Sequence, residues 1–475
     1  MSSLPRSTPE EQGLSTDALD AFVAALDASE QEIHTVMLQR HGQVVLAEQW
    51  SPYRLEDRHL LFSVSKSFTS IGIGLLIADG KLSLDDKVVS FFGEDDLPEK
   101  VSDNLAAMEI RHLLTMTSGH AEDAVVAMTS GPGQDSVVVG AGRAVRAFLG
   151  LEVEHQPGTH FVYNSGATYM LSAILQGITG ESLLDYLRPR LFEPLGAGEA
   201  IWEQSSEGIS FGGWGLSLNT ESLAKFSQLL LQRGEWDGKQ LAPAAWIDEA
   251  TKKQVPNDTE TNPDWKQGYG FQFWRARHNA YRGDGAFGQF CLVFPDHDAT
   301  LVITSASPNM QAVMDIVWSH LLPALQGESG DGTPRPAKLE ILPPTGPAPS
   351  GDGRTYEFDP SVTGIKSIRL DPDGTGIITL EAGPLTEYAE APEGTTQELV
   401  FAPGDWRESI DELRDPAQRV VTSAYGDGDT FVATLRHLET PYVVTLRCRP
   451  EGDVLQVSAK FNVSFGSPEL TLRSR

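Results

Sequence analysis

A proline-rich segment divides this chain of 475 residues into two parts with different patterns. Residues 331–350 (DGTPRPAKLEILPPTGPAPS) contain six of the 29 prolines, and Gly-Asp-Gly follows at 351–353. Because proline lacks an amide N–H and fixes φ, such a segment cannot continue a helix or a central strand. We therefore predict a semi-rigid linker over residues 331–353, between a first domain at 1–330 and a second at 354–475.

The first part alternates helical and strand patterns. Apolar residues recur at helical spacing in 63–79, which ends before Gly80, and in 168–178 and 223–232. Runs rich in β-branched residues flank His41-Gly42 and predict a hairpin. After the linker, short alternating runs separated by Asp-Gly and Gly-Asp turns predict an all-β module, a sandwich or a barrel.

Composition argues against several classes of function. The 36 Lys and Arg residues stand against 66 Asp and Glu residues, which gives a formal net charge of −30. That charge disfavours nucleic acid and anionic membrane surfaces, because both need a basic face. Residues 1–14 are polar, and the most apolar stretch, 70–78, is far shorter than the ~20 residues of a membrane span. With two cysteines, the sequence predicts a soluble cytoplasmic protein without a disulfide framework.

The sequence predicts neither a cofactor nor a metal site. It lacks the GxSxG, HExxH, Walker A and CxxC motifs, and its 11 histidines are scattered, with no ligand pair on one helix face. Residues 283–288 (GDGAFG) match the letters of the dinucleotide motif GxGxxG. That motif requires a helix after it to hold the pyrophosphate, whereas 289–295 (QFCLVFP) has the pattern of a strand.

Ser63-Val-Ser-Lys66 is the strongest chemical signal. Ser63 opens a predicted helix, on which residues i and i+3 share a face, so the Lys66 amine can reach the Ser63 hydroxyl. A serine becomes a nucleophile when a neighbouring base takes its proton, and burial at a helix N-terminus lowers the pKa of a lysine toward that role. The same spacing occurs at Ser222 and Lys225, where the helical pattern predicts a solvated lysine. A capping serine with a surface lysine is the ordinary explanation of such a pair, but the apolar neighbours of Lys66 predict burial.

Two further segments carry residues suited to the same chemistry. Tyr163 follows Pro157-Gly158 and precedes a helical pattern, where a phenol can point into a cleft; a half-buried strand tyrosine is the alternative. Gly283 and Gly285 lie in a strand pattern, where glycine lets a substrate lie against the backbone and the next amide can donate to a carbonyl oxygen. The alternative there is a bulged edge strand.

Five segments, in order, resemble the characteristic stretches of the serine β-lactamase / D,D-peptidase superfamily, in its class C-like branch. They are FSVSKSFTS at 62–70, IRHLLTMTSG at 110–119, PGTHFVYNSG at 157–166, GGWGLSLNT at 212–220 and GAFGQFCLVFP at 285–295. That branch includes family VIII carboxylesterases, D-amino-acid peptidases and amide-dimer hydrolases. The resemblance covers about residues 8–325. It implies an α+β fold, with an antiparallel sheet, flanking helices and an all-helical lobe, to which this chain adds a C-terminal all-β domain.

The resemblance also implies roles for individual residues. Ser63 corresponds to the acylated nucleophile, Lys66 to the residue that shares its proton and Tyr163 to the general base. The backbone N–H groups of Ser63 and Ala286 correspond to the oxyanion hole. Gly285 and Ser165 correspond to residues that contact the substrate.

Two positions depart from the family pattern. The second box reads Tyr163-Asn164-Ser165, where Tyr-x-Asn is usual. The third reads Gly283-Asp284-Gly285 in place of Lys-Thr-Gly or His-Thr-Gly, so the cation that holds a substrate carboxylate is missing. Arg282 is adjacent, but on a strand its side chain is expected to point to the other face. We therefore expect a neutral ester, lactone or amide as substrate in preference to a β-lactam or a peptide terminus.

The sequence thus predicts a serine hydrolase that acts through an acyl-enzyme on a small-molecule carboxylic ester or lactone, with no cofactor, nucleic acid or membrane partner. An amide or D-amino peptide is the alternative substrate. The alternative from another class is a catalytically inactive binding or scaffolding protein with this fold. The presence of Ser63, Lys66 and Tyr163 together favours the enzyme. We expect the C-terminal module to be a stabilising appendage.

Overall fold

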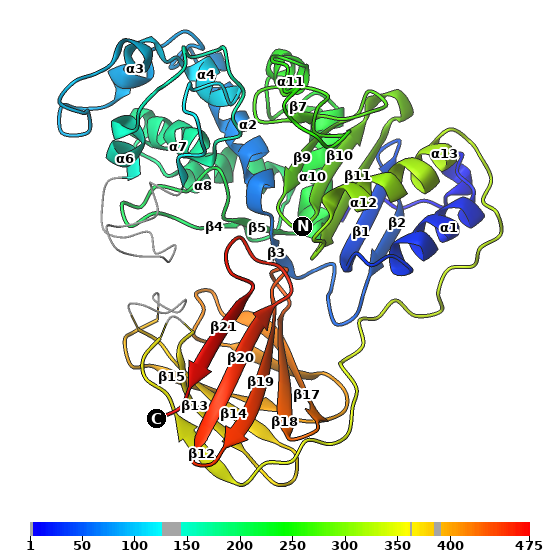
Figure 1. Ribbon diagram of the computed structural model, residues 1–475. Coiled ribbons are helices and arrows are strands. Elements are labelled where there is room, and N and C mark those ends of the chain that lie inside the picture. The colour runs from blue at the N-terminus through cyan, green and yellow to red at the C-terminus, as the bar shows by residue number, and fades with distance from the viewer. Residues whose placement is uncertain (1–2, 126–143, 362, 384–390) are drawn as a thin grey trace. The chain divides into compact units, whose positions relative to one another are not determined.

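The computed structural model describes residues 3–125, 144–361, 363–383 and 391–475 (Figure 1). The chain forms two compact units, one of residues 1–48 and 58–337 and the other of residues 49–57 and 338–475. The dividing line at 337/338 lies inside the predicted linker. None of the helices described is long and apolar enough to cross a membrane.

A six-stranded sheet forms the centre of the first unit. Its strand order is β2-β1-β11-β10-β9-β8, and the pairs from β1 through β11, β10 and β9 to β8 are antiparallel. The inner strands β10 (Gln289–Phe294) and β11 (Ala299–Ser305) are buried over their whole length, as strands covered on both faces are. The other strands are β1 (Ile33–Arg40), β2 (Gln43–Gln49), β8 (Trp274–Arg275) and β9 (Tyr281–Gly285). The predicted hairpin at His41-Gly42 joins β1 to β2.

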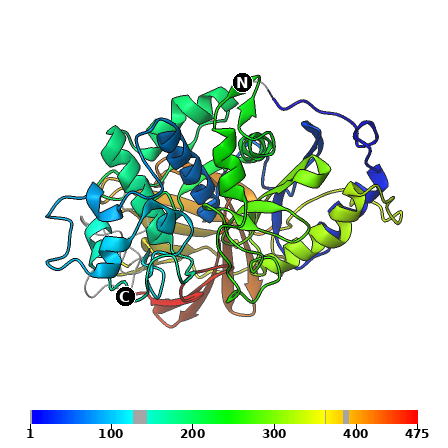
Figure 2. The same ribbon diagram turned by 90° about the horizontal axis from the view of Figure 1, so that it is seen from above.

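Helices cover both faces of this sheet (Figures 1 and 2). On one face, α10 (Thr220–Leu231) packs against β1, β10 and β11. On the other face, α1 (Thr16–Asp27) packs against α12 (Met310–Ile316), and α13 (Leu322–Leu325) follows α12 in the chain. The apolar side chains that predicted the helix α10 are buried: Leu223, Phe226, Leu229 and Leu230.

A second group of helices forms the predicted helical lobe beside the sheet. Its centre is α7 (Ser165–Thr179), which contacts α2, α4, α6 and α8. The Asn164 side chain caps the start of α7, and Gly180, with φ of 75°, ends it. The other α-helices among the described residues of the unit are α2 (Ser65–Ala78), α3 (Asp103–Ala107), α4 (Ile110–Leu114), α6 (Ala144–Gly150), α8 (Leu183–Leu187), α9 (Glu193–Leu195) and α11 (Ala244–Thr251).

Glycine lets β9 approach the start of α2 closely. A Cβ on Gly283 would lie 2.6 Å from Ser67 Oγ, and one on Gly285 would lie 2.1 Å from the Leu61 carbonyl oxygen. Since β9 is paired on both sides, with β10 and β8, it is not the bulged edge strand that the sequence allowed. The small strands of the unit are β3 (Arg58–Leu60), β4 (Ile201–Trp202) and β5 (Leu216–Asn219), in the order β3-β5-β4, and the pair β6 (Glu235–Trp236) and β7 (Lys239–Gln240).

The second unit consists of two antiparallel sheets around one core. Apolar side chains of both sheets belong to that core, for example Ile368 and Leu399 from one and Val420 and Leu446 from the other. This is the sandwich form of the predicted all-β module. The sheets contain β12 (Arg354–Glu357), β13 (Ile365–Leu370), β14 (Gly376–Glu381) and β15 (Thr396–Phe401), and β16 (Arg407–Asp411), β17 (Gln418–Asp427), β18 (Thr430–His437), β19 (Val443–Glu451), β20 (Val454–Phe461) and β21 (Glu469–Arg473).

A short segment between β2 and β3, Gln49–Asp57, belongs to this second unit. Its Tyr53 is buried beside Val421 and Leu438, and the Tyr53 hydroxyl accepts from Arg436 at 3.1 Å. The predicted linker also packs here, because the Pro347 carbonyl oxygen accepts from the Gly426 amide at 2.7 Å. The chain therefore passes between the two units three times.

Candidate active site

Ser63 lies in a single 3-10 turn, η2 (Phe62–Val64), between β3 and α2. The helix predicted over 63–79 begins as this turn and continues as α2 from Ser65. The Ser65 hydroxyl donates to the Phe62 carbonyl oxygen at 2.5 Å and accepts from the Leu216 amide at 3.1 Å. These two bonds fix the turn, and with it Ser63, against β5.

Lys66 contacts the Ser63 hydroxyl, as the spacing predicts. Its Nζ donates to Ser63 Oγ at 3.0 Å, to Ser165 Oγ at 3.1 Å and to the Gly213 carbonyl oxygen at 2.7 Å. The side chain is only 1% exposed. Burial lowers the pKa of Lys66 to about 7, although two nearby carboxylates oppose this. A lysine amine close to neutrality beside a serine hydroxyl is a suitable base for nucleophilic catalysis.

Tyr163 lies on another side of the same hydroxyl. Lys66 Nζ is 4.7 Å from the centre of its ring, which stacks on the Trp274 indole at 5.2 Å. The Ser63 side chain favours the ionised form of the Tyr163 phenol, an effect that burial outweighs. Burial raises the pKa of the phenol well above its ordinary value, so Tyr163 keeps its proton at neutral pH. The three predicted catalytic residues are therefore in contact.

The two residues after Tyr163 have different contacts. Ser165 Oγ accepts from Lys66, so this hydroxyl lies in the site. Asn164 is fully buried and accepts from the Ala167 amide at 3.1 Å, so it serves as the cap of α7. The departure from the family's second box thus places a serine hydroxyl beside the lysine amine.

Asp123 is a site residue that the sequence analysis missed. Its Oδ1 accepts from the Ser165 amide at 2.8 Å and from the Gly166 amide at 3.4 Å, at the positive end of α7. The carboxylate therefore fixes the start of α7 and the position of the Ser165 hydroxyl beside Lys66. Asp123 and Ser165 are 42 positions apart in the chain, so no local spacing indicated the contact.

Two phenylalanines with positive φ flank the predicted oxyanion amides. Phe62, with φ of 47°, precedes Ser63, and Phe287, with φ of 64°, follows Ala286. Their rings meet edge to face, with centres 5.5 Å apart. The Phe287 carbonyl oxygen accepts from the Ser307 amide at 2.8 Å. Such backbone strain costs about 1–3 kcal/mol and persists where the surroundings hold it, often at active sites.

A buried glutamine joins three helices at the site. The Gln272 Oε1 accepts from the Thr168 hydroxyl of α7 at 2.6 Å, and its carbonyl oxygen accepts from the Ser67 hydroxyl of α2 at 3.0 Å. Its Nε2 donates to two carbonyl oxygens of α4, those of Leu113 at 3.1 Å and Leu114 at 3.0 Å. Because all these groups are buried, the bonds hold α2, α4 and α7 in fixed relation.

The second Ser-x-x-Lys pair has a structural role. Lys225 is 4% exposed and not solvated as the helical pattern predicted. Its Nζ donates to the Gly196 carbonyl oxygen at 2.7 Å and pairs with Glu221 at 3.6 Å. The Ser222 hydroxyl accepts from the Gly198 amide at 2.8 Å. The loop at 196–198 covers the part of α10 that contains Ser222 and Lys225. The periodicity of one helix cannot predict that a distant loop covers it.

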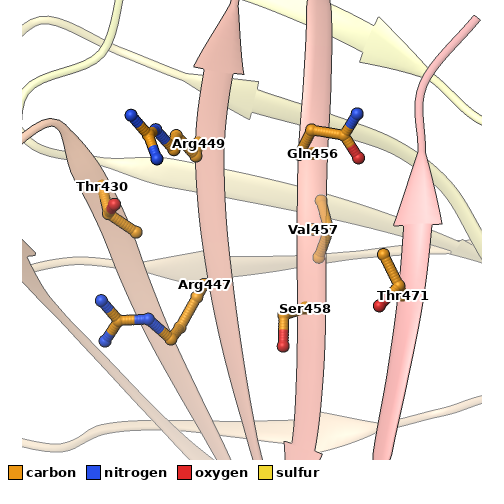
Figure 3. Close-up of a pocket in the computed structure, with 7 residues that line it drawn as sticks. All are labelled: Thr430, Arg447, Arg449, Gln456, Val457, Ser458 and Thr471. Atoms are coloured by element: carbon orange, nitrogen blue, oxygen red, sulfur yellow. The ribbon is translucent and has the colours of Figure 1, made fainter.

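A shallow hollow of about 280 Å³ lies on the outer face of β19, β20 and β21 in the second unit (Figure 3). Two arginines line it, but each pairs with an aspartate: Arg447 with Asp427 at 2.5 Å and Arg449 with Asp429 at 3.4 Å. The residues that line the hollow are Thr430, Arg447, Arg449, Gln456, Val457, Ser458 and Thr471. These side chains include no activated nucleophile, so the candidate active site is the one around Ser63.

Within the described residues, no group of three or more His, Cys, Asp or Glu side chains is arranged to hold a metal ion.

The chain is similar to a known protein family and to several individual proteins. A family model described as Beta-lactamase matches residues 19–321. The 6-aminohexanoate-dimer hydrolase of Paenarthrobacter ureafaciens is 26% identical over 322 residues, 64% of this chain and 80% of that protein. The lovastatin esterase of Penicillium rubens is 28% identical over 193 residues, 37% of this chain and 47% of the esterase. The octameric penicillin-binding protein homologue from Pyrococcus abyssi matches 96% of this chain and 99% of its own, with a TM-score of 0.53 and 15% identity, which is a likeness of fold alone.

Proposed function

This chain belongs to the beta-lactamase family, and from that premise we propose that it is a serine hydrolase that forms an acyl-enzyme on Ser63 and acts on an uncharged carboxylic ester or lactone. The observation that carries the proposal is the contact of Lys66 Nζ with Ser63 Oγ at 3.0 Å, in a site where the lysine is buried. A serine with that neighbour can lose its proton as it attacks a carbonyl carbon.

Lys66 is the better proton acceptor of the two candidates. Burial lowers its pKa to about 7, whereas burial raises the pKa of Tyr163. A general base works best when its pKa lies near the working pH. We therefore assign Lys66 as the base, and Tyr163, whose ring centre is 4.7 Å from Lys66 Nζ, as the group that passes the proton onward.

The reaction has two acyl-transfer steps. Ser63 Oγ bonds to the carbonyl carbon while its proton goes to Lys66, and the carbonyl oxygen gains negative charge. The Ser63 and Ala286 amides would donate to that oxygen. The C–O bond to the leaving group then breaks, and the proton returns to the leaving oxygen. A water molecule attacks the acyl-enzyme in the same way and releases the acid and the free serine.

Support for a substrate without a carboxylate comes from β9. The position of the missing cation is Gly283, where a Cβ would already lie 2.6 Å from Ser67 Oγ. The neighbouring Asp284 carboxylate interacts with both Lys66 and Tyr163. A carboxylate in the site repels an anionic substrate.

An amide or D-amino peptide is the second candidate substrate. It is favoured by the similarity to the 6-aminohexanoate-dimer hydrolase, which extends over 80% of that protein, whereas the similarity to lovastatin esterase favours the ester. An amine leaving group must be protonated before it departs, and Lys66 in its protonated form could supply that proton.

The test is hydrolysis of 4-nitrophenyl butyrate, γ-butyrolactone, a D-alanine 4-nitroanilide and a chromogenic cephalosporin. Ser63→Ala is expected to abolish turnover, and the matched variant Ser222→Ala, in the second Ser-x-x-Lys pair, is expected to keep it. Turnover of ester or lactone alone supports the proposal. Preference for the anilide moves the assignment to the amide candidate. Equal rates for wild type and Ser63→Ala contradict the mechanism, and no turnover of any substrate favours the binding or scaffolding alternative.

A further inference from the structure

The strand β9 carries a buried ion pair beside the catalytic residues. Arg282 and Asp284 are two residues apart on the strand, so their side chains share a face. The intervening Gly283 faces α2, at Ser67. On the neighbouring strand β8, Trp274 pairs directly with Arg282, and Tyr163 stacks on that indole. The ion pair therefore lies on the face of the sheet that Tyr163 packs against.

Arg282 is a fully buried cation whose anionic partner is Asp284. Its Nε donates to Asp284 Oδ2 at 2.9 Å, and the side chain is 0% exposed. Its Nη1 donates to the carbonyl oxygens of Asp264 at 3.1 Å and Arg275 at 3.2 Å, which are neutral groups. The Asp264 carboxylate pairs with Arg277 at 2.8 Å, and the charge of Arg282 also lowers its pKa. Within the described residues, Arg282 Nη2 has no hydrogen-bond partner.

Asp284 lies close enough to the catalytic residues to act on them. Its charge raises the pKa of Lys66 and of Tyr163. Both members of the ion pair are buried, with Asp284 5% and Arg282 0% exposed. The guanidinium of Arg282 lies over the Trp265 ring, 4.5 Å from its centre.

We propose that Arg282 forms a carboxylate-binding subsite in the wall of the active site and that the Asp284 carboxylate fills it from within the chain. A buried guanidinium needs an anion, and an unpaired one is strongly destabilising. With Asp284 in place, a substrate carboxylate meets a filled subsite and a like charge. The pair thus selects substrates that are uncharged at this position, an inference that rests on the proposed function for its biological meaning.

Removing the Asp284 carboxylate should leave a hole of carboxylate size over a guanidinium that has lost its hydrogen-bonded anion. Asp284→Ala in a Ser63→Ala background is therefore expected to have a lowered melting temperature, which sodium formate restores and sodium chloride at equal ionic strength does not. The parent Ser63→Ala protein should respond alike to both salts. The matched control is Asp20→Ala on α1, which breaks the 2.8 Å pair of Asp20 with Arg335 and should show no formate effect.

Equal responses of Asp284→Ala to formate and chloride would overturn the proposal. If the variant folds only in formate, that result supports it. If it folds in neither salt, Asp284→Ser, which keeps a hydroxyl toward Arg282, is measured in the same way, and its lack of a formate effect would also overturn the proposal. These measurements need no turnover, so they remain decisive if the proposed function fails.

Substrate selectivity provides the second measurement. The ratio of kcat/KM for mono-4-nitrophenyl glutarate, which carries a free carboxylate, to that for 4-nitrophenyl butyrate is compared in proteins with an intact Ser63. Asp284→Ala is expected to raise this ratio about tenfold or more, since one charge-assisted hydrogen bond is worth about that factor. The added change Arg282→Met should abolish the gain, and Asp20→Ala should leave the ratio unchanged. A ratio that does not move in Asp284→Ala contradicts the subsite.

Discussion

Replacing Lys66 by methionine is expected to stabilise the fold while it abolishes catalysis. The ammonium of Lys66 is buried, and burial lowers its pKa from 10.5 to about 7. A difference of one pH unit in pKa corresponds to about 1.36 kcal/mol, so the charged form is disfavoured in the folded state by about 5 kcal/mol. Methionine has a similar length and no charge, so it removes this destabilisation of the folded state.

The substitution also has a cost. Methionine cannot donate to the Gly213 carbonyl oxygen, which Lys66 Nζ contacts at 2.7 Å. A buried acceptor left without a partner costs about 1–3 kcal/mol. Lys66→Met is therefore expected to raise the free energy of unfolding by about 2–4 kcal/mol at pH 6, the difference between these two effects.

The gain in stability from Lys66→Met should become smaller as the pH rises. Below about pH 7, Lys66 is protonated in both the folded and the unfolded protein, and the destabilisation by its charge is complete. Between pH 7 and 10.5 the unfolded protein binds a proton that the folded protein lacks, so the stability of the wild type rises with pH. The advantage of Lys66→Met should therefore fall by about 2.7 kcal/mol by pH 9, which leaves the variant about as stable as the wild type.

The assay is urea unfolding followed by tryptophan fluorescence at pH 6 and pH 9. The matched control is Lys225→Met, which removes a buried lysine of the second Ser-x-x-Lys pair. Because Lys225 is paired with Glu221, this variant should be destabilised at both pH values. The reasoning is refuted if Lys66→Met is less stable than the wild type at pH 6, or if its advantage does not shrink at pH 9.

Three further predictions concern rate and packing. For an ester whose leaving group does not titrate, kcat/KM should rise about tenfold per pH unit below about pH 7 and then level, because neutral Lys66 is the base. A pH-stat assay measures this profile, and a flat profile from pH 5 to 8 contradicts the assignment of Lys66. Gly285→Ala should lower kcat by about a hundredfold or more, because its Cβ would lie 2.1 Å from the Leu61 carbonyl oxygen and would displace the backbone next to the proposed oxyanion amides. An unchanged kcat would argue against that geometry. Gln272→Leu should lower the free energy of unfolding by about 2–4 kcal/mol, because it leaves buried partners such as the Thr168 hydroxyl unpaired. Urea unfolding measures this, and an unchanged free energy of unfolding would contradict the stabilising role of Gln272.

Local patterns predicted the parts of this protein that depend on local geometry. The apolar spacing of α10 and the hairpin at His41-Gly42 follow from the periodicities of helix and strand. The contact of Lys66 with Ser63 follows from their separation of three residues at the start of a helix, although the first turn is a 3-10 turn and α2 begins at Ser65.

Features that depend on distant parts of the chain had no such signal. Asp123 accepts from the Ser165 amide at the start of α7, 42 positions away, and the burial of Lys225 depends on the loop at 196–198. The segment Gln49–Asp57 joins the second unit because Tyr53 packs beside residues more than 350 positions later. These contacts are formed by tertiary packing, which a pattern within one element does not record.

The central claim is that Ser63 carries the acyl group. Rapid-quench intact-mass spectrometry with 4-nitrophenyl butyrate, followed by peptide mapping, measures it directly. We predict a transient mass increase of one butyryl group on the peptide that contains Ser63, present in the wild type and in Ser222→Ala and absent in Ser63→Ala. An adduct on another residue, or the same adduct in Ser63→Ala, would contradict the account.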